Sequence, residues 1–309
     1  PFFQGIKLDL CDPLIANTQW EWPAMWEAGF VILQGAESGF WIHCRDKSYR
    51  YKALSVGRGN CPNSLGFEAE AYGPLDYNLA AGGIEWRINV YKGGWQVPAS
   101  IYRDWLWKAY DLKKQENLRK DWTHDIKMAI CWCPADIKIL EALSRKIEPR
   151  KVIIHLPRWR TDKYDVNYPD YIPNDEAKAF IKRGKELGYH IMPHCNSMEV
   201  DPLNPLYGYV KDFQFRDINK KRAVGWIWHE GEWSFEIPSS NAQLAKHRDK
   251  HLMVKIHPGL SMWRHILAER IYKAVAGLDI DAVFIDITLC TFNLHNCLVE
   301  NTTPTEGIK

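Results

Sequence analysis

The chain has 309 residues, a formal net charge of +2 and hydrophobic residues at 46% of its positions. This length can bury a sizeable core and suffices for two domains. The nearly balanced charge argues against electrostatic binding to nucleic acid or to an anionic membrane, and no apolar run is long enough to span a bilayer.

The sequence begins with Pro1 rather than Met, so we expect the natural N-terminus to be missing. The localisation, cytoplasmic or exported, and the oligomeric state therefore stay open at this stage.

Residues 27–97 have the alternating pattern of antiparallel strands. GFVILQGAESGFWIHCRD contains two strand-like runs about a turn with Gly, and GIEWRINVYKGGW alternates with period two before a Gly-Gly break. We therefore predict an antiparallel β-sandwich domain over residues 1–98. The pattern changes near Val97, where VPASIYRDWLWKAYDLKK has apolar residues at helical spacing after a start at Pro98 or Ser100. This predicts a linking helix over residues 99–120.

From residue 121 onward strand-like and helix-like segments alternate, which is typical of a parallel βα architecture. Strands are expected in IKMAICWCP, KVIIHLPRW, HIMPHCNSM and AVFIDIT, and helices in ADIKILEALSRKI, NDEAKAFIKRGKELG and LSMWRHILAERIYKAVAGL. A complete (β/α)8 TIM barrel needs about 250 residues, so residues 121–309 have room for about half of one. The ending TPTEGIK is similar to a capped helix start, which favours a truncated barrel over an open sheet.

Polar and aromatic side chains follow these apolar strands where each one ends. They are Trp132, Arg158, Trp159, His194, Asn196, Asp286 and Thr288. Because the carboxyl ends of parallel strands meet at one edge of a sheet, we expect these side chains to share a site. Asp286 directly follows the apolar run that ends at Ile285, so its carboxylate must be hydrogen-bonded or open onto a site.

Each of these residues also has a structural alternative. Asp286 could cap the next helix, Arg158 could pack on Trp159 as a cation–π pair, and His194 and Asn196 could hydrogen-bond their own loop. The later segment GWIWHEGEWSFEI predicts a hairpin that carries Glu230 and Glu232. This hairpin is a candidate flap over a substrate, although a solvated hairpin tip is the favoured interpretation.

The cysteines and aromatic residues add two expectations. Eight scattered cysteines favour reduced or buried thiols over a disulfide framework. Cys131 and Cys133 form a C-x-C pair whose thiols would point the same way along a strand, but no second pair follows at zinc-site spacing, so we predict neither metal nor cofactor. Of the 15 Trp residues, we expect most to be structural and a few to line a site, since flat amphipathic rings suit sugars.

With the sandwich pattern, the IYRDW helix at 101–105 and the FIDIT strand in this order, the chain resembles retaining glycoside hydrolases in which a supersandwich domain precedes a (β/α)8 barrel. The likeness is to bacterial domains related to endo-α-N-acetylgalactosaminidases and, more remotely, to α-galactosidases. It implies a glycosidase acting on a carbohydrate, with the Asp that ends strand four as nucleophile, which by position is Asp286. The family's acid/base lies on a later strand, beyond this sequence.

Two other classes stay open. A metal-dependent hydrolase would use His155, His194, His257 and Asp286, but such enzymes commonly have closely paired histidines on the first strand, and MAICWCP has none. A non-catalytic carbohydrate-binding protein with the same fold is the third possibility, because no acid/base is identified within the sequence.

Overall fold

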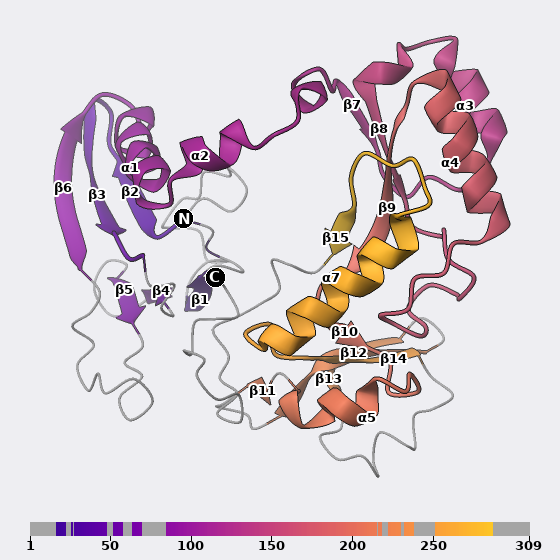
Figure 1. Cartoon of the computed structure of the whole chain (residues 1–309). Helices are drawn as coiled ribbons and strands as arrows, with labels where there is room; N and C mark the ends of the chain where they lie inside the picture. Colours follow the sequence, from indigo (N-terminus) through magenta and orange to yellow (C-terminus); the bar gives the residue numbers. More distant parts are fainter. Residues whose placement is uncertain are drawn as a thin grey trace. The chain divides into compact units, whose positions relative to one another are not determined.

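The structure is a computed structural model that describes residues 17–22, 26, 28–47, 52–57, 64–69, 85–214, 216–217, 222–229, 232–237 and 251–286. These residues fall into two compact units, one ending at Arg119 and the other beginning at Lys120. Figure 1 labels the helices and strands of both units.

Two antiparallel sheets form the N-terminal unit (Figure 1). One has the order β1-β4-β5, with strands Thr18–Trp22, Lys52–Gly57 and Ser64–Ala69. The other has the order β2-β3-β6, with strands Phe30–Gln34, Ser38–Cys44 and Trp86–Lys92. Side chains of both sheets meet in one hydrophobic cluster, in which Trp20 and Leu54 pack with Val31. The prediction of antiparallel strands in this region is confirmed.

Helix α1 (Gln96–Ala109) packs on the other face of the β2-β3-β6 sheet, where its Tyr102 contacts Trp41. The predicted start of this helix was wrong, because α1 begins at Gln96 and the Ser100 hydroxyl donates within the first turn to the Val97 carbonyl. The predicted linking helix over 99–120 is also interrupted. The chain turns at Asp111, whose φ is 49°, before a short α2 (Leu112–Asn117).

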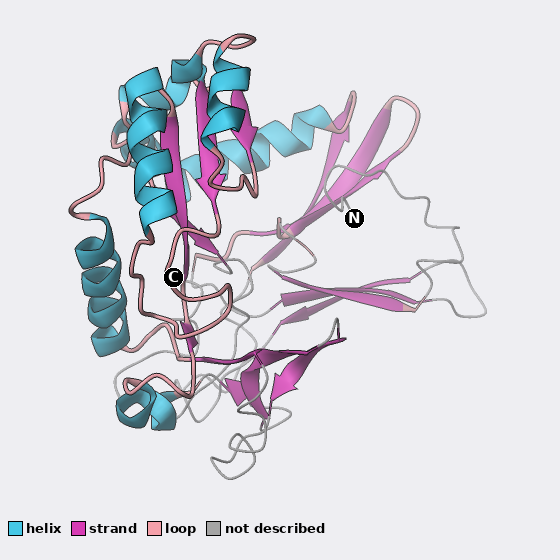
Figure 2. Cartoon of the chain, turned by 90° about the vertical axis from the view of Figure 1, so that its right-hand side faces the viewer, coloured by secondary structure: helices cyan, strands magenta, loops and turns pink. Residues whose placement is uncertain are grey.

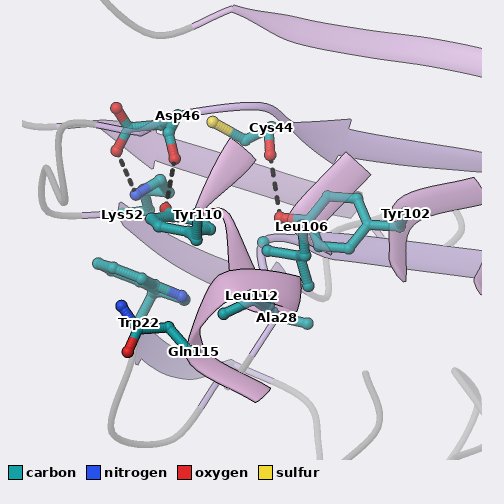
Figure 3. Close-up of a pocket in the computed structure, with 11 residues that line it drawn as sticks. Trp22, Ala28, Cys44, Asp46, Lys52, Tyr102, Leu106, Tyr110, Leu112 and Gln115 are labelled. Carbon is teal, nitrogen blue, oxygen red and sulfur yellow. Dashed lines mark hydrogen bonds and ion pairs between the residues drawn. The ribbon is translucent and has the colours of Figure 1, made fainter. Parts of the chain in front are cut away.

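A cavity of about 410 Å³ lies in the N-terminal unit between α1, α2 and the sheets (Figure 3). The Lys52 ammonium bonds the Asp46 carboxylate at 2.8 Å and lies 3.8 Å from the centre of the Trp22 ring. The Tyr110 hydroxyl donates to the Asp46 carbonyl, and the Tyr102 hydroxyl donates to the Cys44 carbonyl. The polar groups that line this cavity therefore tie the helices to the strands.

The C-terminal unit is built on a curled parallel sheet with the order β15-β9-β8-β7, in the form of a half-barrel. Its strands are Phe284–Asp286, His190–Asn196, Val152–Leu156 and Met128–Ile130. All three pairings between neighbours are parallel. Each strand was predicted from its apolar run, and sequence order is also the order across the sheet. The mixed α/β class and the partial barrel are thereby supported.

Three predicted helices of this unit are present (Figure 2). They are α3 (Ile137–Ser144), α4 (Asp175–Leu187) and α7 (Ser261–Val275). Asp136 and Asn174 cap the first two by accepting backbone N–H bonds, and Gly188, with φ 97°, ends α4. Leu140 of α3 and Phe180 of α4 pack in the same core as Ile154 and Ile191 of the sheet. These two helices therefore cover one face of the parallel strands.

A second, antiparallel sheet is inserted between β9 and α7 and was not predicted as a sheet. It has the order β10-β14-β12-β11, with β13 paired to β12. The strands are Glu199–Val200, His251–Lys255, Arg222–His229, Arg216–Asp217 and Glu232–Ile237. The predicted hairpin is the β12–β13 pair, in which His229 lies opposite Glu232. A short α5 (Tyr207–Val210) and Trp263 of α7 pack on β10 and β14.

Short 3-10 helices complete the elements, at Asp121–His124, Pro149–Lys151 and Lys211–Phe213. Among the helices that the structure describes, none has the length and apolar character needed to cross a membrane.

Candidate active site

Polar side chains gather on one face of the parallel sheet near its carboxyl end. Successive side chains of a strand point to opposite faces, so residues two apart share a face. Ile154 and Ile191 belong to the core beneath α3 and α4. The opposite face, here the inner face, carries His155, His194, Asn196, Phe284 and Asp286, because β15 pairs in register with β9.

Two histidines on neighbouring strands are hydrogen-bonded to each other within this face. His155 Nε2 lies 3.0 Å from His194 Nδ1, and the backbone N–H of Trp132 donates to His155 Nδ1 over 3.3 Å. On the far side, His194 Nε2 lies 2.9 Å from Asn196 Oδ1 and 3.8 Å from Asp286 Oδ2. A continuous chain of polar contacts thus runs from the end of β7 to the end of β15.

Burial lowers the pKa of both histidines. His155 and His194 are only 2% and 1% exposed. The pKa of His194 falls to about 4, because burial outweighs the Asp286 charge and the Asn196 hydrogen bond, which favour protonation. Burial also lowers the pKa of His155 against the same carboxylate. Both rings are therefore neutral near pH 7, and each carries a single hydrogen.

The loop between β8 and α4 holds Tyr164 against His194. The Tyr164 oxygen lies 3.2 Å from His194 Nε2, and burial raises the pKa of this phenol, so it keeps its proton. Arg160 braces the loop from within, since its guanidinium donates to the carbonyl oxygens of Lys163, Val166 and Asp170. The tyrosine is thus held by a buried cation rather than by a regular element.

Trp132 has an unusual backbone conformation directly after β7. Its φ is 56°, a left-handed value that costs a residue with a side chain about 1–2 kcal/mol. The residue is 56% exposed, and its ring centre lies 5.2 Å from that of Tyr164 and 6.1 Å from that of His194. Strained residues of this kind are concentrated at functional sites, which supports a binding role for the exposed ring.

Two carboxyl groups near the strand ends differ in their surroundings. The Asp286 side chain is 35% exposed at the end of β15. Glu199 of β10 is 1% exposed, and burial raises the pKa of its carboxyl to about 7 in spite of the opposing charge of Lys255. Glu199 Oε2 accepts the Met198 N–H, whereas Oε1 has no hydrogen-bond partner among the described residues. Asp286 is the accessible carboxyl of the pair.

The structure brings together four of the residues predicted for the site, namely Trp132, His194, Asn196 and Asp286. Trp159 does not fit its predicted role in substrate stacking. Its side chain is fully buried, its Nε1–H donates to the His194 carbonyl over 2.7 Å, and its ring stacks on Tyr171. It supports the site from the core side of the sheet. Arg158 has an exposed side chain.

Thr288 and Glu230 lie outside the described residues, and Glu232 is described only as the first residue of the β13 backbone. The proposed flap is therefore present as a hairpin, while its role stays a prediction.

The cysteine pair and the metal-dependent alternative find no structural support. Strand β7 ends at Ile130, so Cys131 and Cys133 do not alternate along a strand, and the first is exposed while the second is buried. In the described part of the chain, no three His, Cys, Asp or Glu residues are grouped as metal ligands. Both nitrogens of His155 are already hydrogen-bonded, and His257 Nδ1 accepts the Gly259 N–H.

Three residues of the site were missed or misjudged from the sequence. The sequence suggested His155 only as a metal ligand, although its position one residue before the end of an apolar strand could have identified it as a site residue. Tyr164 lies in a loop without periodicity, and its position depends on Arg160. Glu199 follows β9 closely, but only the unpredicted pairing of β10 with β14 buries it.

Comparison with protein families finds one match. The model of a family described as "Domain of unknown function (DUF6259)" matches residues 83–305 of the chain. No curated protein matches the sequence.

Comparison with solved structures finds glycosidases. The α-N-acetylgalactosaminidase from Bifidobacterium bifidum in complex with GalNAc has a TM-score of 0.58 at 13% identity, over 96% of this chain and 51% of that one. Its ligand-free form has a TM-score of 0.56 at 13% identity, over 87% and 47%. A GH36 α-galactosidase from Geobacillus stearothermophilus has a TM-score of 0.48 at 14% identity, over 87% and 37%. At such identity the likeness shows a glycoside hydrolase-like fold alone, and the chain spans about half or less of these proteins.

Proposed function

The chain belongs to the DUF6259 family, and we propose that it forms part of a retaining glycoside hydrolase in which Asp286 is the nucleophile. The position of Asp286 carries this proposal. Asp286 is the last residue of β15, and its side chain belongs to the inner face of the sheet and is 35% exposed. Its carboxylate lies 3.8 Å from His194 Nε2 and has no close cationic partner among the described residues. A carboxylate in this position is open to a substrate and can act as a nucleophile.

The substrate class that we propose is an α-linked galactoside or N-acetylgalactosaminide. The fold likeness to the Bifidobacterium bifidum α-N-acetylgalactosaminidase supports it, since the likeness extends over 96% of this chain. In this proposal the N-terminal sheets are the supersandwich domain, and the parallel sheet is the first half of a (β/α)8 barrel. The acid/base then belongs to the second half of the barrel, on a later strand.

The chemistry would proceed in two steps. An Asp286 oxygen attacks the anomeric carbon as the glycosidic C–O bond breaks, and the leaving oxygen takes a proton from the acid. Water then attacks the anomeric carbon of the glycosyl ester, gives its proton to the conjugate base of that acid, and releases Asp286 as a carboxylate.

Neighbouring residues would hold the sugar. The exposed Trp132 indole offers a flat face to the ring of the sugar. Asn196 Nδ2 is buried and has no acceptor among the described residues, so it is a candidate donor to a sugar hydroxyl. We propose His194 as a second polar contact, and Arg158 and Thr288 as contacts at the edge of the site.

The test uses the complete protein with aryl α-galactosides, aryl α-N-acetylgalactosaminides and their β counterparts. We expect wild type to turn over one of the α substrates and Asp286→Asn to lower kcat by about 10³-fold or more. Asp279→Asn, an exposed change in the segment before β15, is the matched control and should keep wild-type turnover. Undiminished hydrolysis by Asp286→Asn would remove the nucleophile assignment.

Calorimetric titration of both forms with galactose and N-acetylgalactosamine separates an enzyme from a binding module. Binding by wild type and Asp286→Asn, with no turnover of any substrate, would replace the proposed glycosidase by a non-catalytic carbohydrate-binding protein.

A further inference from the structure

The hydrogen bonds that link Trp132, His155 and His194 across the inner face all donate in one direction. The first donor is the backbone amide of Trp132. A backbone N–H can only donate, so the bond from Trp132 N to His155 Nδ1 makes that nitrogen an acceptor. In a neutral imidazole the other nitrogen then carries the hydrogen. His155 Nε2–H therefore donates to His194 Nδ1, 3.0 Å away. By the same rule, the single hydrogen of His194 lies on its Nε2.

The opposite end of the chain could not set this direction. The side-chain amide of Asn196 can present either oxygen or nitrogen to His194 Nε2, and the Tyr164 hydroxyl can donate or accept. Both groups adapt to the hydrogen that they meet. Only the Trp132 amide has no alternative, and its orientation is held by the left-handed backbone at φ 56°.

We propose that His155 is a positioning residue. It accepts a hydrogen bond from the Trp132 amide, donates one to His194 Nδ1, and so keeps the His194 hydrogen on Nε2, the nitrogen nearer to Asp286. This inference rests on the proposed role of Asp286 for its catalytic meaning, but the tautomer itself does not depend on that role. Among the described residues, the hydrogen-bonded path from His155 towards the carboxylate passes through His194.

This arrangement has two consequences for the site. A neutral N–H lies 3.8 Å from Asp286 Oδ2, so the carboxylate faces a polar group without the tight ion pair that an imidazolium would make. The Tyr164 oxygen lies 3.2 Å from the same nitrogen and cannot donate to it, because that nitrogen already carries a hydrogen. The hydroxyl hydrogen of Tyr164 is therefore available to a ligand.

Nuclear magnetic resonance of the protein with ¹⁵N-labelled histidine tests the proposal directly. Long-range ¹H–¹⁵N correlations at pH 7 distinguish protonated from unprotonated ring nitrogens for each histidine. We expect the hydrogen on Nε2 of both His155 and His194 in wild type. A His194 hydrogen on Nδ1, or a charged His194 ring, would overturn the proposal without any variant having to fold.

Two variants then separate His155 from its surroundings. His155→Gln keeps an N–H donor near the Nε2 position, so His194 should retain one tautomer. His155→Leu removes the donor, so the two nitrogens of His194 should show averaged shifts from both tautomers. An unchanged single tautomer in a folded His155→Leu protein would show that His155 does not fix it.

Kinetics of the complete protein connect the tautomer to the reaction. We expect His155→Leu to lower kcat by about tenfold with little change in KM, and His155→Gln to stay within a few-fold of wild type. Equal losses in the two variants would contradict positioning through a donated hydrogen. Absence of turnover in wild type would instead remove the proposed function, while the resonance measurements would still decide the tautomer.

Discussion

Asp286 lies opposite Asn196 in the parallel pairing of β15 with β9. At the other end of the same segment, Asp281 accepts from the Lys185 ammonium at 2.7 Å and from the Ile191 N–H at 3.2 Å. Asp281 thus joins the segment before β15 to α4 and to the start of β9. Asp281 therefore fixes the start of this segment, whereas Asp286 lies at its end, in the candidate site.

This difference predicts that the same substitution, Asp to Asn, lowers the stability of the protein at position 281 and hardly changes it at position 286. Asp281→Asn should lower the free energy of unfolding by about 1–3 kcal/mol, because Lys185 and the Ile191 N–H lose a charged acceptor. Asp286→Asn should change it by less than about 0.5 kcal/mol, since its carboxylate is partly exposed. Urea denaturation of the two variants and wild type measures both values. Equal destabilisation would contradict the division of roles.

Because the hydroxyl hydrogen of Tyr164 is available to a ligand, removing this hydroxyl should weaken ligand binding without affecting folding. Tyr164→Phe keeps the ring beside Trp132 and His194 and removes only the oxygen. We expect kcat/KM to fall by about 2- to 10-fold, the worth of one neutral hydrogen bond, mainly through KM. Tyr209→Phe, which changes a phenol that is 78% exposed on α5, is the control. A kcat/KM equal to wild type would show that no ligand group accepts from Tyr164.

The parallel strands and the polar residues at their ends could be predicted from the sequence, because both follow from local pattern. Apolar runs such as the one before Asp286 identify buried strands, and parallel strands align their carboxyl ends. Trp132 and His194 were found in this way. The pattern did not say which face a residue beyond the strand end occupies, which is why Trp159 was assigned to the ligand although it packs in the core.

The rest of the site depends on contacts that have no local signal. Tyr164 reaches His194 only because Arg160 organises its loop, and Glu199 is buried only because β10 pairs with β14. The direction of the histidine chain depends on the left-handed conformation of Trp132, which nothing in the residues around it required. Such features are set by the tertiary structure and could not be read from periodicity.

The stability of the N-terminal unit should depend strongly on its buried ion pair, because each charge is buried against the other. The Lys52 and Asp46 side chains are 4% and 2% exposed and lie 2.8 Å apart (Figure 3). Lys52→Met should lower the free energy of unfolding by about 3–5 kcal/mol, because it leaves the Asp46 charge buried without its ammonium. The double variant Lys52→Met/Asp46→Leu should be more stable than Lys52→Met alone. Thermal and urea unfolding provide the comparison, and a less stable double variant would contradict this account.

Two buried groups near the site should give opposite dependences of stability on pH. Burial lowers the pKa of His194 to about 4, whereas an unfolded histidine titrates near 6.5. As the pH falls through this window, the unfolded chain takes up a proton that the folded protein does not, so stability from His194 is lost towards acid. Asp286 and Asn196 face this ring and oppose the shift without reversing it.

Glu199 should act in the other direction. Its folded pKa is raised to about 7 by burial, against the charge of Lys255, and an unfolded glutamate titrates near 4.3. As the pH rises between these values, the unfolded chain releases a proton that the folded protein keeps. The Glu199 contribution is therefore fully present below about pH 4.3 and is lost as the pH approaches 7, by up to about 3 kcal/mol.

Glu199→Gln removes this dependence and is the variant to measure. Its free energy of unfolding minus that of wild type should increase steadily from pH 4.5 to pH 7.5, because only wild type loses stability through Glu199 in that range. Glu176→Gln, in the exposed first turn of α4, is the matched control. Urea denaturation at one-unit steps of pH gives both differences. A difference for Glu199→Gln that does not change with pH would show that this carboxyl is already ionised in the folded protein.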